Sequence, residues 1–472
     1  MQDVLHKLLE PFAGGVTVDA AGAIVVPNPA VLAGPATDAL VRAAVFGAPA
    51  TKDVARWALW EIGQVVGVCP GSIHDLYAAR GKGQAHGFTV PAINIRCLTY
   101  DSARALFRAA KRLGAGAFLL EIARSEIAYT DQRPAEYVAV LQGAALREGF
   151  RGPLFVQGDH CQANAKKYAA GPQAEIDAVK GLITEEIAAG FYNIDVDTST
   201  LVDLSKPTLL EQQRLNYEHA AEITHFIRDR EPEGVSVSVG AEIGEVGHKN
   251  STVEELRAFM AGYNAELKKH GSPEGISKIS VQTGTSHGGV VLPDGTIAKV
   301  KLDLDALAAL SKSAREEYGM SGAVQHGAST LPPDAFGNFP RLETAEIHLA
   351  TNFQSLVFDS AALPAELRER MYRWLDGNAE SERKAGDTPE QFYYKARKKA
   401  IGPFKGEVWS LPPEVRGAIA AELEKTFDFL FEQLKVTGTA ALVQKYVKAP
   451  YQAHASLQRA LVTAVDDAEA GE

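Results

Sequence analysis

The stretch ISVQTGTSHGGVV (residues 279–291) begins as an apolar run typical of a buried β-strand and then breaks into small polar residues. His287 follows that run and precedes Gly288 and Gly289. One interpretation is a turn with an exposed histidine. The other is a ligand at the tip of a strand, beside backbone that no side chain shields. A single histidine does not decide between them, so the rest of the chain has to be considered.

Runs like this one alternate with helical segments from about residue 70 onward. Most are apolar on both faces, as the strands of a parallel sheet covered by helices are. Eight such runs predict a (β/α)8 barrel, the TIM-barrel fold. We expect an N-terminal extension (residues 1–70), a catalytic barrel (71–360) and a helical C-terminal extension (361–472). The runs are FTVPAINI (88–95), GAFLLEI (116–122), PLFVQGD (153–159), FYNIDVD (191–197), VSVSVGAEIG (235–244), ISKISVQTG (276–284), GAVQHG (322–327) and TAEIHLATN (344–352).

The composition and the net charge indicate what kinds of binding partner the protein is expected to have. The chain has 472 residues and a formal net charge of −11, which argues against a broad nucleic-acid footprint. No apolar run approaches the ~18 residues of a membrane span, and the start does not resemble a signal peptide. The three cysteines are widely separated, so we expect neither a disulfide framework nor a zinc ribbon. We expect a cytoplasmic homo-oligomer that acts on a small molecule.

Polar residues gather at the carboxyl ends of the predicted strands, which is the face where barrel enzymes keep their active sites. Three histidines from three strand tips suit a catalytic Zn²⁺, which typically takes three protein ligands and leaves a position for substrate. Each histidine taken alone could instead be a hydrogen-bonded residue of the barrel rim. The three are His160, His287 and His326.

Carboxylates accompany these histidines. Asp159 directly precedes His160 and could move a proton of a substrate hydroxyl, or simply cap the following helix. Glu242 and Asp197 could orient metal ligands, hold a second divalent or monovalent cation, or form structural salt bridges.

Glycines and hydroxyls also follow two of the strands. Gly288 comes after His287, and Gly327 comes after His326. Exposed backbone N–H groups beside the hydroxyls of Ser329 and Thr351 are what a phosphate-binding loop needs.

At these residues the sequence resembles the class II, metal-dependent ketose-bisphosphate aldolases, which act on fructose and tagatose bisphosphates. The resemblance covers roughly residues 70–400. It implies a proton-transfer role for Asp159, zinc ligation by three histidines, a place near the metal for Glu242 and Asp197, and phosphate binding by Gly288, Gly327 and Ser329. The matching segments are PGSIHDLYAARGKGQAHGFTVPAINI (70–95), GDHCQANAKK (158–167), GFYNIDVDTS (190–199), VSVGAEIGEVG (237–247), GTSHGG (284–289) and QHGASTLP (325–332).

The sequence departs from the family in several places. In HLATNFQ (348–354), His348 and Ala350 stand where the family has Asn and Asp, and only Thr351 matches. The acidic loop after the fifth strand is short here, and Glu245, His248 or Glu254 could replace its catalytic glutamate. The segment EIARSE (121–126) resembles the tagatose-aldolase branch. In FYYKARKK (392–399), the resemblance makes Arg397 a candidate for the distal phosphate.

These features predict a zinc-dependent aldolase that acts on a phosphorylated ketose through an enediolate. Substrate contacts are expected from Gly288, Gly327, Ser329, His348, Thr351 and Arg397. Two alternatives remain open: another metal-dependent sugar-phosphate enzyme, such as an epimerase or an aldolase for an unusual sugar, and a non-catalytic companion subunit of a tagatose-bisphosphate aldolase.

Overall fold

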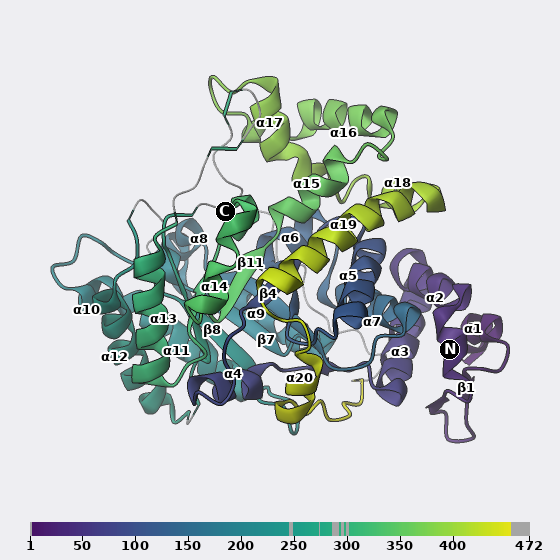
Figure 1. The fold of residues 1–472 in the computed structure, drawn as a ribbon, viewed down its shortest axis with the longest axis horizontal. Helices are drawn as coiled ribbons and strands as arrows, with labels where there is room; N and C mark the ends of the chain where they lie inside the picture. Colours follow the sequence, from purple (N-terminus) through teal and green to yellow (C-terminus); the bar gives the residue numbers. More distant parts are fainter. Residues whose placement is uncertain are drawn as a thin grey trace.

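A closed barrel of parallel strands forms the centre of the molecule, as the sequence predicts (Figure 1). The computed structural model describes residues 2–244, 249–272, 274–285, 292–293, 297–298 and 302–454. The barrel closes where the last strand pairs with the first, with His348 beside Ala92. The strands of the barrel are β4 (Val90–Asn94), β5 (Leu119–Ala123), β6 (Leu154–Gln162), β7 (Asn193–Asp197), β8 (Ser238–Glu242), β9 (Lys278–Val281), β10 (Ala323–Gln325) and β11 (Glu346–Leu349). A short strand, β3 (Pro70–Gly71), pairs with the beginning of β6.

Amphipathic helices cover the outside of the barrel. In α5 (Thr99–Leu113), Ala103, Leu106, Phe107 and Ala110 recur at helical spacing and are buried. The other covering helices are α7 (Pro134–Glu148), α9 (Pro172–Ala189), α11 (Arg214–Arg228), α12 (Val253–His270) and α13 (Leu304–Tyr318). Shorter helices lie in the loops: α6 (Arg124–Tyr129), α8 (Ala165–Ala170), α10 (Leu209–Gln212) and α14 (Asn338–Arg341).

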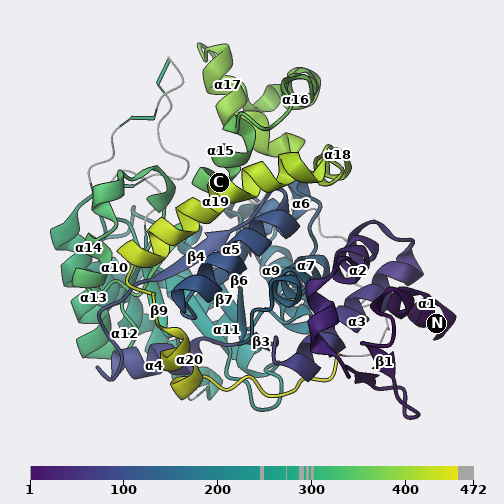
Figure 2. The ribbon, with the colours of Figure 1, turned by 45° about the vertical axis from the view of Figure 1, so that its right-hand side comes forward.

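The residues before the barrel form a small layer on its side (Figure 2). This layer contains the helices α1 (Gln2–Leu9), α2 (Pro35–Phe46) and α3 (Pro49–Val66), with a two-stranded hairpin of β1 (Thr17–Val18) and β2 (Ile24–Val25). Helices α2 and α3 both pack against α7 of the barrel. The helix α4 (His74–Gly81) follows and contacts α13.

The residues after the barrel are helical and reach both of its ends. Helix α15 (Thr351–Asp359) begins directly after β11, and α16 (Ala365–Asn378) and α17 (Pro389–Ala396) stand above it (Figure 1). A turn of 3-10 helix, η7 (Arg397–Ala400), leads into α18 (Lys405–Trp409). The long helix α19 (Pro413–Gln433) then packs along α5, and α20 (Ala440–Tyr446) contacts α4.

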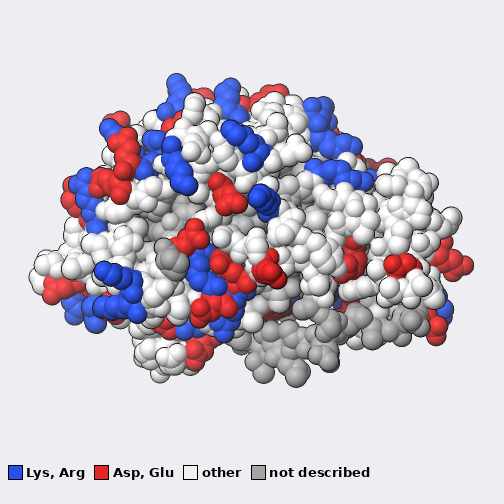
Figure 3. Space-filling view, turned by 90° about the horizontal axis from the view of Figure 1, so that it is seen from below, with Lys and Arg blue, Asp and Glu red and all other residues white. Residues whose placement is uncertain are grey.

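The described helices, the cysteines and the surface charge can be compared with the composition. None of the helices in the described part of the chain is both long and apolar enough to cross a membrane. The three cysteines are buried and form no disulfide. On the face seen in Figure 3, basic and acidic side chains are interspersed.

Candidate active site

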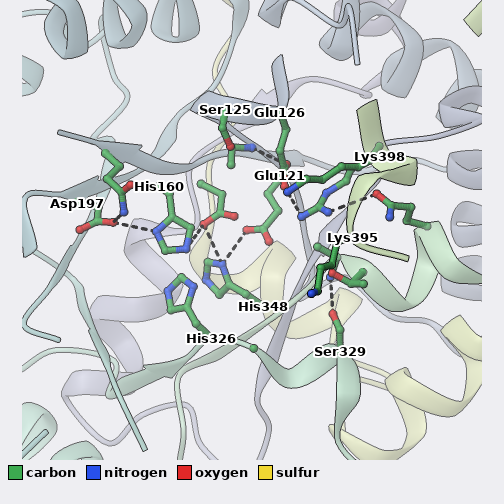
Figure 4. Close-up of a pocket in the computed structure, with 18 of the residues that line it drawn as sticks. Glu121, Ser125, Glu126, His160, Asp197, His326, Ser329, His348, Lys395 and Lys398 are labelled. Atoms are coloured by element: carbon green, nitrogen blue, oxygen red, sulfur yellow. Dashed lines mark hydrogen bonds and ion pairs between the residues drawn. The ribbon is translucent and has the colours of Figure 1, made fainter. Parts of the chain in front are cut away.

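The carboxyl ends of the strands surround a cavity of about 400 Å³ (Figure 4). Its floor and walls come from the barrel, and its mouth is completed by residues of the C-terminal helices. The wall residues include Glu121, Asp159, His160, Asp197, Glu242, His326, Gly327, Ser329, His348 and Thr351, and those at the mouth include Glu382, Lys384, Tyr394, Lys395 and Lys398.

A β-bulge explains how two consecutive residues of β6 both reach this cavity. Neighbouring residues of a regular strand point to opposite faces. The pairing of β6 with β7 shifts register between Gly158 and Cys161, so Asp159 and His160 lie in the irregular stretch. His160 adopts a left-handed backbone with φ of 43°. The bulge thus turns both side chains toward the cavity, as bulges near active sites often do.

His160, Glu242 and His326 form the first candidate metal site. They offer one ligand atom each, and these atoms lie within 4.8 Å of one another. Nδ1 of His160 lies 3.0 Å from Asp197 Oδ2, and Nε2 of His326 lies 3.0 Å from Ser280 Oγ. Metal-bound histidines usually donate their second ring N–H in this way, which fixes the other nitrogen for coordination. Two imidazoles and a carboxylate suit zinc.

The electrostatics of this group also fit a bound cation. Burial raises the pKa of Glu242 to about 8, and the Asp197 carboxylate adds to that rise. Burial opposes a charged His160, but Asp159, Asp197 and Glu242 outweigh it and raise the pKa of His160. Buried carboxylates therefore compete here for positive charge, which a divalent ion would supply.

His348 lies beside this group. Its ring centroid is 4.1 Å from that of His326, and Asp159, His326 and His348 form a second set of potential ligands within 4.8 Å. Nε2 of His348 contacts Glu346 Oε1 at 2.7 Å, and Nδ1 lies 3.2 Å from Glu121 Oε2.

Charged residues also fill the barrel below the cavity. Lys278 on β9 is 1% exposed at its side chain, and its Nζ donates to Glu346 Oε1 at 2.6 Å and to Asp195 Oδ2 at 3.0 Å. Gly240 makes room for this pair, because a Cβ there would lie 2.2 Å from Asp195 Oδ1 and 2.9 Å from Lys278 Cε. Lys278 thus holds the carboxylate of Glu346 in place, and that carboxylate in turn holds the ring of His348.

The loop after β10 and the start of α15 form a second part of the wall. Gly327 has a φ of 68°, a left-handed conformation that glycine adopts without strain. Ser329 Oγ accepts a hydrogen bond from the Ala350 N–H at 2.8 Å, which ties this loop to the residue before α15. Thr351 is the first residue of α15 and lines the cavity. A helix N-terminus beside a glycine-containing loop is a suitable place for an anion.

The mouth of the cavity carries lysines rather than the predicted arginine. Lys395 and Lys398 line the cavity. The Lys395 Nζ is 2.7 Å from Asp387 Oδ1. Arg397 points elsewhere, because its guanidinium bonds to Asp359 at 2.7 Å and to Ser355 at 2.7 Å. Arg397 is not one of the described residues that line the cavity.

The structure therefore gathers most of the residues singled out by sequence into one cavity. His287 and Gly288, and the loop candidates Glu245 and His248, lie outside the described residues. Sequence reasoning missed Glu121 and the lysines of the mouth. Glu121 is the next-to-last residue of the strand-like run at 116–122, so its position near a strand tip was a signal that could have found it.

One solved structure supports the fold, and two others show a weaker likeness. A probable tagatose 6-phosphate kinase from Sinorhizobium meliloti 1021 has a TM-score of 0.51 and 17% identity, over 76% of this chain and 93% of that chain. A fructose-bisphosphate aldolase from Campylobacter jejuni has a TM-score of 0.47 and 18% identity, over 79% and 97% of the two chains. A fructuronate-tagaturonate epimerase from Cohnella laeviribosi has a TM-score of 0.49 and 12% identity, over 93% and 90%. At 17% identity the first of these structures shows the fold alone, and no argument rests on the other two.

The family comparison is more specific. No curated protein matches this chain. The model of the family described as fructose-bisphosphate aldolase, class II, matches residues 76–405. This range includes every barrel strand and the C-terminal segment that carries the lysines of the mouth. The chain therefore belongs to the class II fructose-bisphosphate aldolase family.

Proposed function

We propose that the chain is a zinc-dependent aldolase that cleaves and forms a phosphorylated ketose. The observation that carries this proposal is the convergence of His160, Glu242 and His326 within 4.8 Å at the base of a cavity that Asp159 also lines. When bound there, zinc would act as a Lewis acid for a substrate carbonyl and hydroxyl. His287 of the sequence would be a further ligand.

Asp159 is the proposed proton-transfer residue. In the cleavage direction, its carboxylate accepts the proton of the C4 hydroxyl, and the bond between C3 and C4 breaks. The electrons of that bond form an enediolate on the C1–C3 fragment, and the C4 fragment leaves as an aldehyde. A proton taken up at C3 from solvent then converts the enediolate into the ketone product. Asp159 is 6% exposed, so bulk water does not compete strongly for this proton.

The two ends of the cavity suggest how a phosphorylated substrate is held. Gly327, Ser329 and the start of α15 at Thr351 would bind one phosphate through N–H and O–H donors. Lys395 and Lys398 would attract an anionic group at the mouth, because each carries a positive charge where the cavity opens. These groups bind parts of the substrate that do not react, so they set its position along the cavity.

The test is a coupled assay for a dihydroxyacetone-phosphate-like product across a panel of phosphorylated ketoses, including fructose and tagatose 1,6-bisphosphate. We expect turnover of at least one ketose, loss of that activity with chelator, and recovery with Zn²⁺. His160→Ala and His326→Ala should each lose most activity and metal, while His225→Ala serves as a control histidine on the outer helix α11.

The same experiment separates the alternatives. Conversion of a ketose into its epimer without an aldehyde product would show that the protein is an epimerase and not an aldolase. A chain that binds no metal and turns over no ketose would instead be a companion subunit.

A further inference from the structure

The irregular stretch of β6 is contacted from outside the barrel by Glu186, a buried residue of helix α9 that is 0% exposed. Its Oε2 accepts a hydrogen bond from the Cys161 thiol at 3.2 Å, and its carboxylate lies against the backbone of Gly158. These two residues of β6 stand on either side of the bulge, because Gly158 pairs with Ile194 and Cys161 pairs with Val196. Both ends of the bulge therefore meet the same carboxylate.

Gly158 leaves the space that this carboxylate occupies. A Cβ at this position would lie 2.6 Å from Glu186 Oε2 and 2.8 Å from Glu186 Oε1, so any larger residue would displace the carboxylate. Gly158 is not one of the described glycines with a positive φ, so its backbone conformation is open to other residues. Glycine is therefore needed here for space, and the space is filled by Glu186.

The contact with Cys161 requires the bulged strand. Side chains on one face of a regular strand are two residues apart, so Gly158 would share its outward face with His160. Here Gly158 and Cys161 both face Glu186, and His160 lines the cavity. An interaction that is made in one conformation and not in the other shifts the equilibrium toward the first.

The bulge needs such support because it holds a residue in an uncommon conformation. His160 has a φ of 43° although it is not glycine. A conformation of this kind costs free energy and persists only where the surrounding structure fixes it. The hydrogen bond from Cys161 and the close approach of Glu186 to Gly158 are contacts that fix the chain on both sides of His160.

We propose that Glu186 is a positioning residue that holds the bulge of β6 through Gly158 and Cys161. The bulge in turn places Asp159 and His160 together in the cavity. This role rests on the proposed function, in which Asp159 transfers the proton and His160 binds the metal. Glu186 is not one of the described residues that line the cavity, so it acts on turnover and metal affinity without touching the substrate.

The competing explanation is that Glu186 only fills space behind the strand. Its loss would then lower stability and leave the active site of the folded molecules unchanged. A positioning role instead makes turnover and metal affinity fall in chains that remain folded. A side chain that restores the acceptor at position 186 then restores both quantities.

The test compares variants that remove the contact with variants that conserve it. Glu186→Ala and Cys161→Ala lose the acceptor and the donor, whereas Glu186→Gln and Cys161→Ser keep them. The measurements on folded protein are kcat on the best ketose, affinity for Zn²⁺ by competition with a chromophoric chelator, and amide hydrogen exchange of the peptide 154–162. We expect both alanine variants to lose about tenfold or more in kcat and in Zn²⁺ affinity, and to exchange faster in that peptide. The conservative variants should recover most of each loss.

Glu185→Gln and Cys69→Ala are the matched controls. Glu185 precedes Glu186 on α9 but accepts a hydrogen bond from Arg133, and Cys69 is a buried cysteine outside β6. Both controls should match the wild type in turnover, Zn²⁺ affinity and amide exchange.

Gly158→Ala probes the same contact from the strand, because its Cβ would displace the carboxylate while Glu186 is kept. It should cause similar losses, and combining it with Glu186→Ala should add little, since both changes remove one interaction. Cys161→Ala removes only the sulfur, so its comparison with Cys161→Ser decides the matter even if Glu186→Ala does not fold.

Amide exchange requires neither metal nor sugar. A wild type that binds no Zn²⁺ and cleaves no ketose would refute the proposed function, while the exchange of the peptide 154–162 would still report whether Glu186 holds the bulge. Exchange at the wild-type rate in folded Glu186→Ala and Cys161→Ala would overturn the positioning role. Equal losses of kcat in Cys161→Ala and Cys161→Ser would also overturn it, because the serine keeps the donor.

Discussion

At the scale of single residues, the register shift in β6 decides the chemistry. Asp159 and His160 share one cavity only because the strand is irregular between Gly158 and Cys161. The motif Asp-His predicts both roles from sequence, but period-2 alternation would have placed the two side chains on opposite faces. The resemblance to the aldolase family predicts that both side chains reach the active site, whereas the pattern of apolar residues does not.

Asp159 gives the first prediction. Asp159→Ala should retain metal at His160, Glu242 and His326 but lower kcat by roughly 10²–10⁴-fold, the usual effect of a lost acid–base group. Steady-state kinetics on the best ketose and metal analysis of the same sample measure both quantities. Unchanged kcat would reduce Asp159 to a helix-capping or structural role.

Gly240 gives the second prediction, on stability. In Gly240→Ala the new Cβ would meet Asp195 Oδ1 at 2.2 Å and Lys278 Cε at 2.9 Å, in a part of the barrel that is tightly filled. We expect a loss of about 1–3 kcal/mol in the free energy of unfolding. Gly181→Ala in α9 is the control, because nothing lies within 4 Å of a Cβ there, and it should be neutral or stabilising by up to ~1 kcal/mol. Equal denaturation midpoints for the two variants would contradict the prediction.

The side-chain contacts of other residues could not be determined from the sequence alone. The sequence marks His348 as a departure from the family, but its contacts with Glu121 and Asp159 depend on strands that meet only in the closed barrel. Lys278 sits at the start of an apolar run and gives no sign of the charged interior around it. Long-range neighbours of this kind cannot be inferred from periodicity.

At the scale of elements, the strands and covering helices follow the predicted pattern, and the last strand is shorter than its run. The run 344–352 contains β11 only as far as Leu349, and α15 begins at Thr351. The change from strand to helix brings Thr351 to the cavity. In the segment 392–399, Lys395 and Lys398 are three residues apart and share one face of a helical turn, whereas Arg397 lies on another.

The lysines of the mouth give the third prediction. Lys395→Met and Lys398→Met should each raise KM for a phosphorylated ketose about tenfold, with a smaller change in kcat, since they bind a group that does not react. Lys312→Met on α13 is the control, with a side chain that is 66% exposed. If Arg397→Met raised KM more than either lysine variant, the distal anion would be bound by the arginine instead.

The contact between α9 and α11 gives a prediction on pH. Hydrogen bonds from His219 and then Lys180 outweigh the effect of burial and lower the pKa of Glu222 to about 2. A carboxylate with a lowered pKa stabilises the folded state above its unfolded pKa, and this stabilisation is lost as the pH falls from about 4.5 to about 2. Because the pair is partly exposed, Glu222→Gln should cost about 1 kcal/mol or less at pH 7.

Urea denaturation of wild type and Glu222→Gln at several pH values checks this expectation. The difference in the free energy of unfolding should shrink as the pH falls below about 4.5, because the Glu222 carboxylate of the unfolded wild type is protonated there while that of the folded protein stays ionised until about pH 2. A difference that stays constant down to pH 2.5 would show that Glu222 acts through packing.

At the scale of the whole molecule, three regions of the sequence meet at Trp409. Its ring stacks on Tyr100 of the barrel helix α5 at 6.1 Å and meets Phe46 of the N-terminal helix α2 edge to face at 5.4 Å. Arg42 also donates to the Trp409 carbonyl at 3.2 Å. Helix α18, which ends at Trp409, follows the turn that carries Lys398. The N-terminal layer therefore supports the segment that completes the mouth of the cavity.

This contact gives the last prediction, a double-mutant cycle between Phe46 and Trp409. Trp409→Ala should lower the free energy of unfolding by about 3–5 kcal/mol, since Trp409 is 6% exposed. Phe46→Ala should cost less, since Phe46 is 40% exposed. The edge-to-face pair should couple the two losses by about 0.5–1.5 kcal/mol, so the double variant loses less than the sum. Trp374→Ala, whose ring instead meets Phe404, provides the control pair with Phe46→Ala and should be additive. Additive losses in both pairs would mean that the N-terminal layer and the C-terminal helices are stabilised independently, and that truncating the layer would leave the mouth of the cavity unchanged.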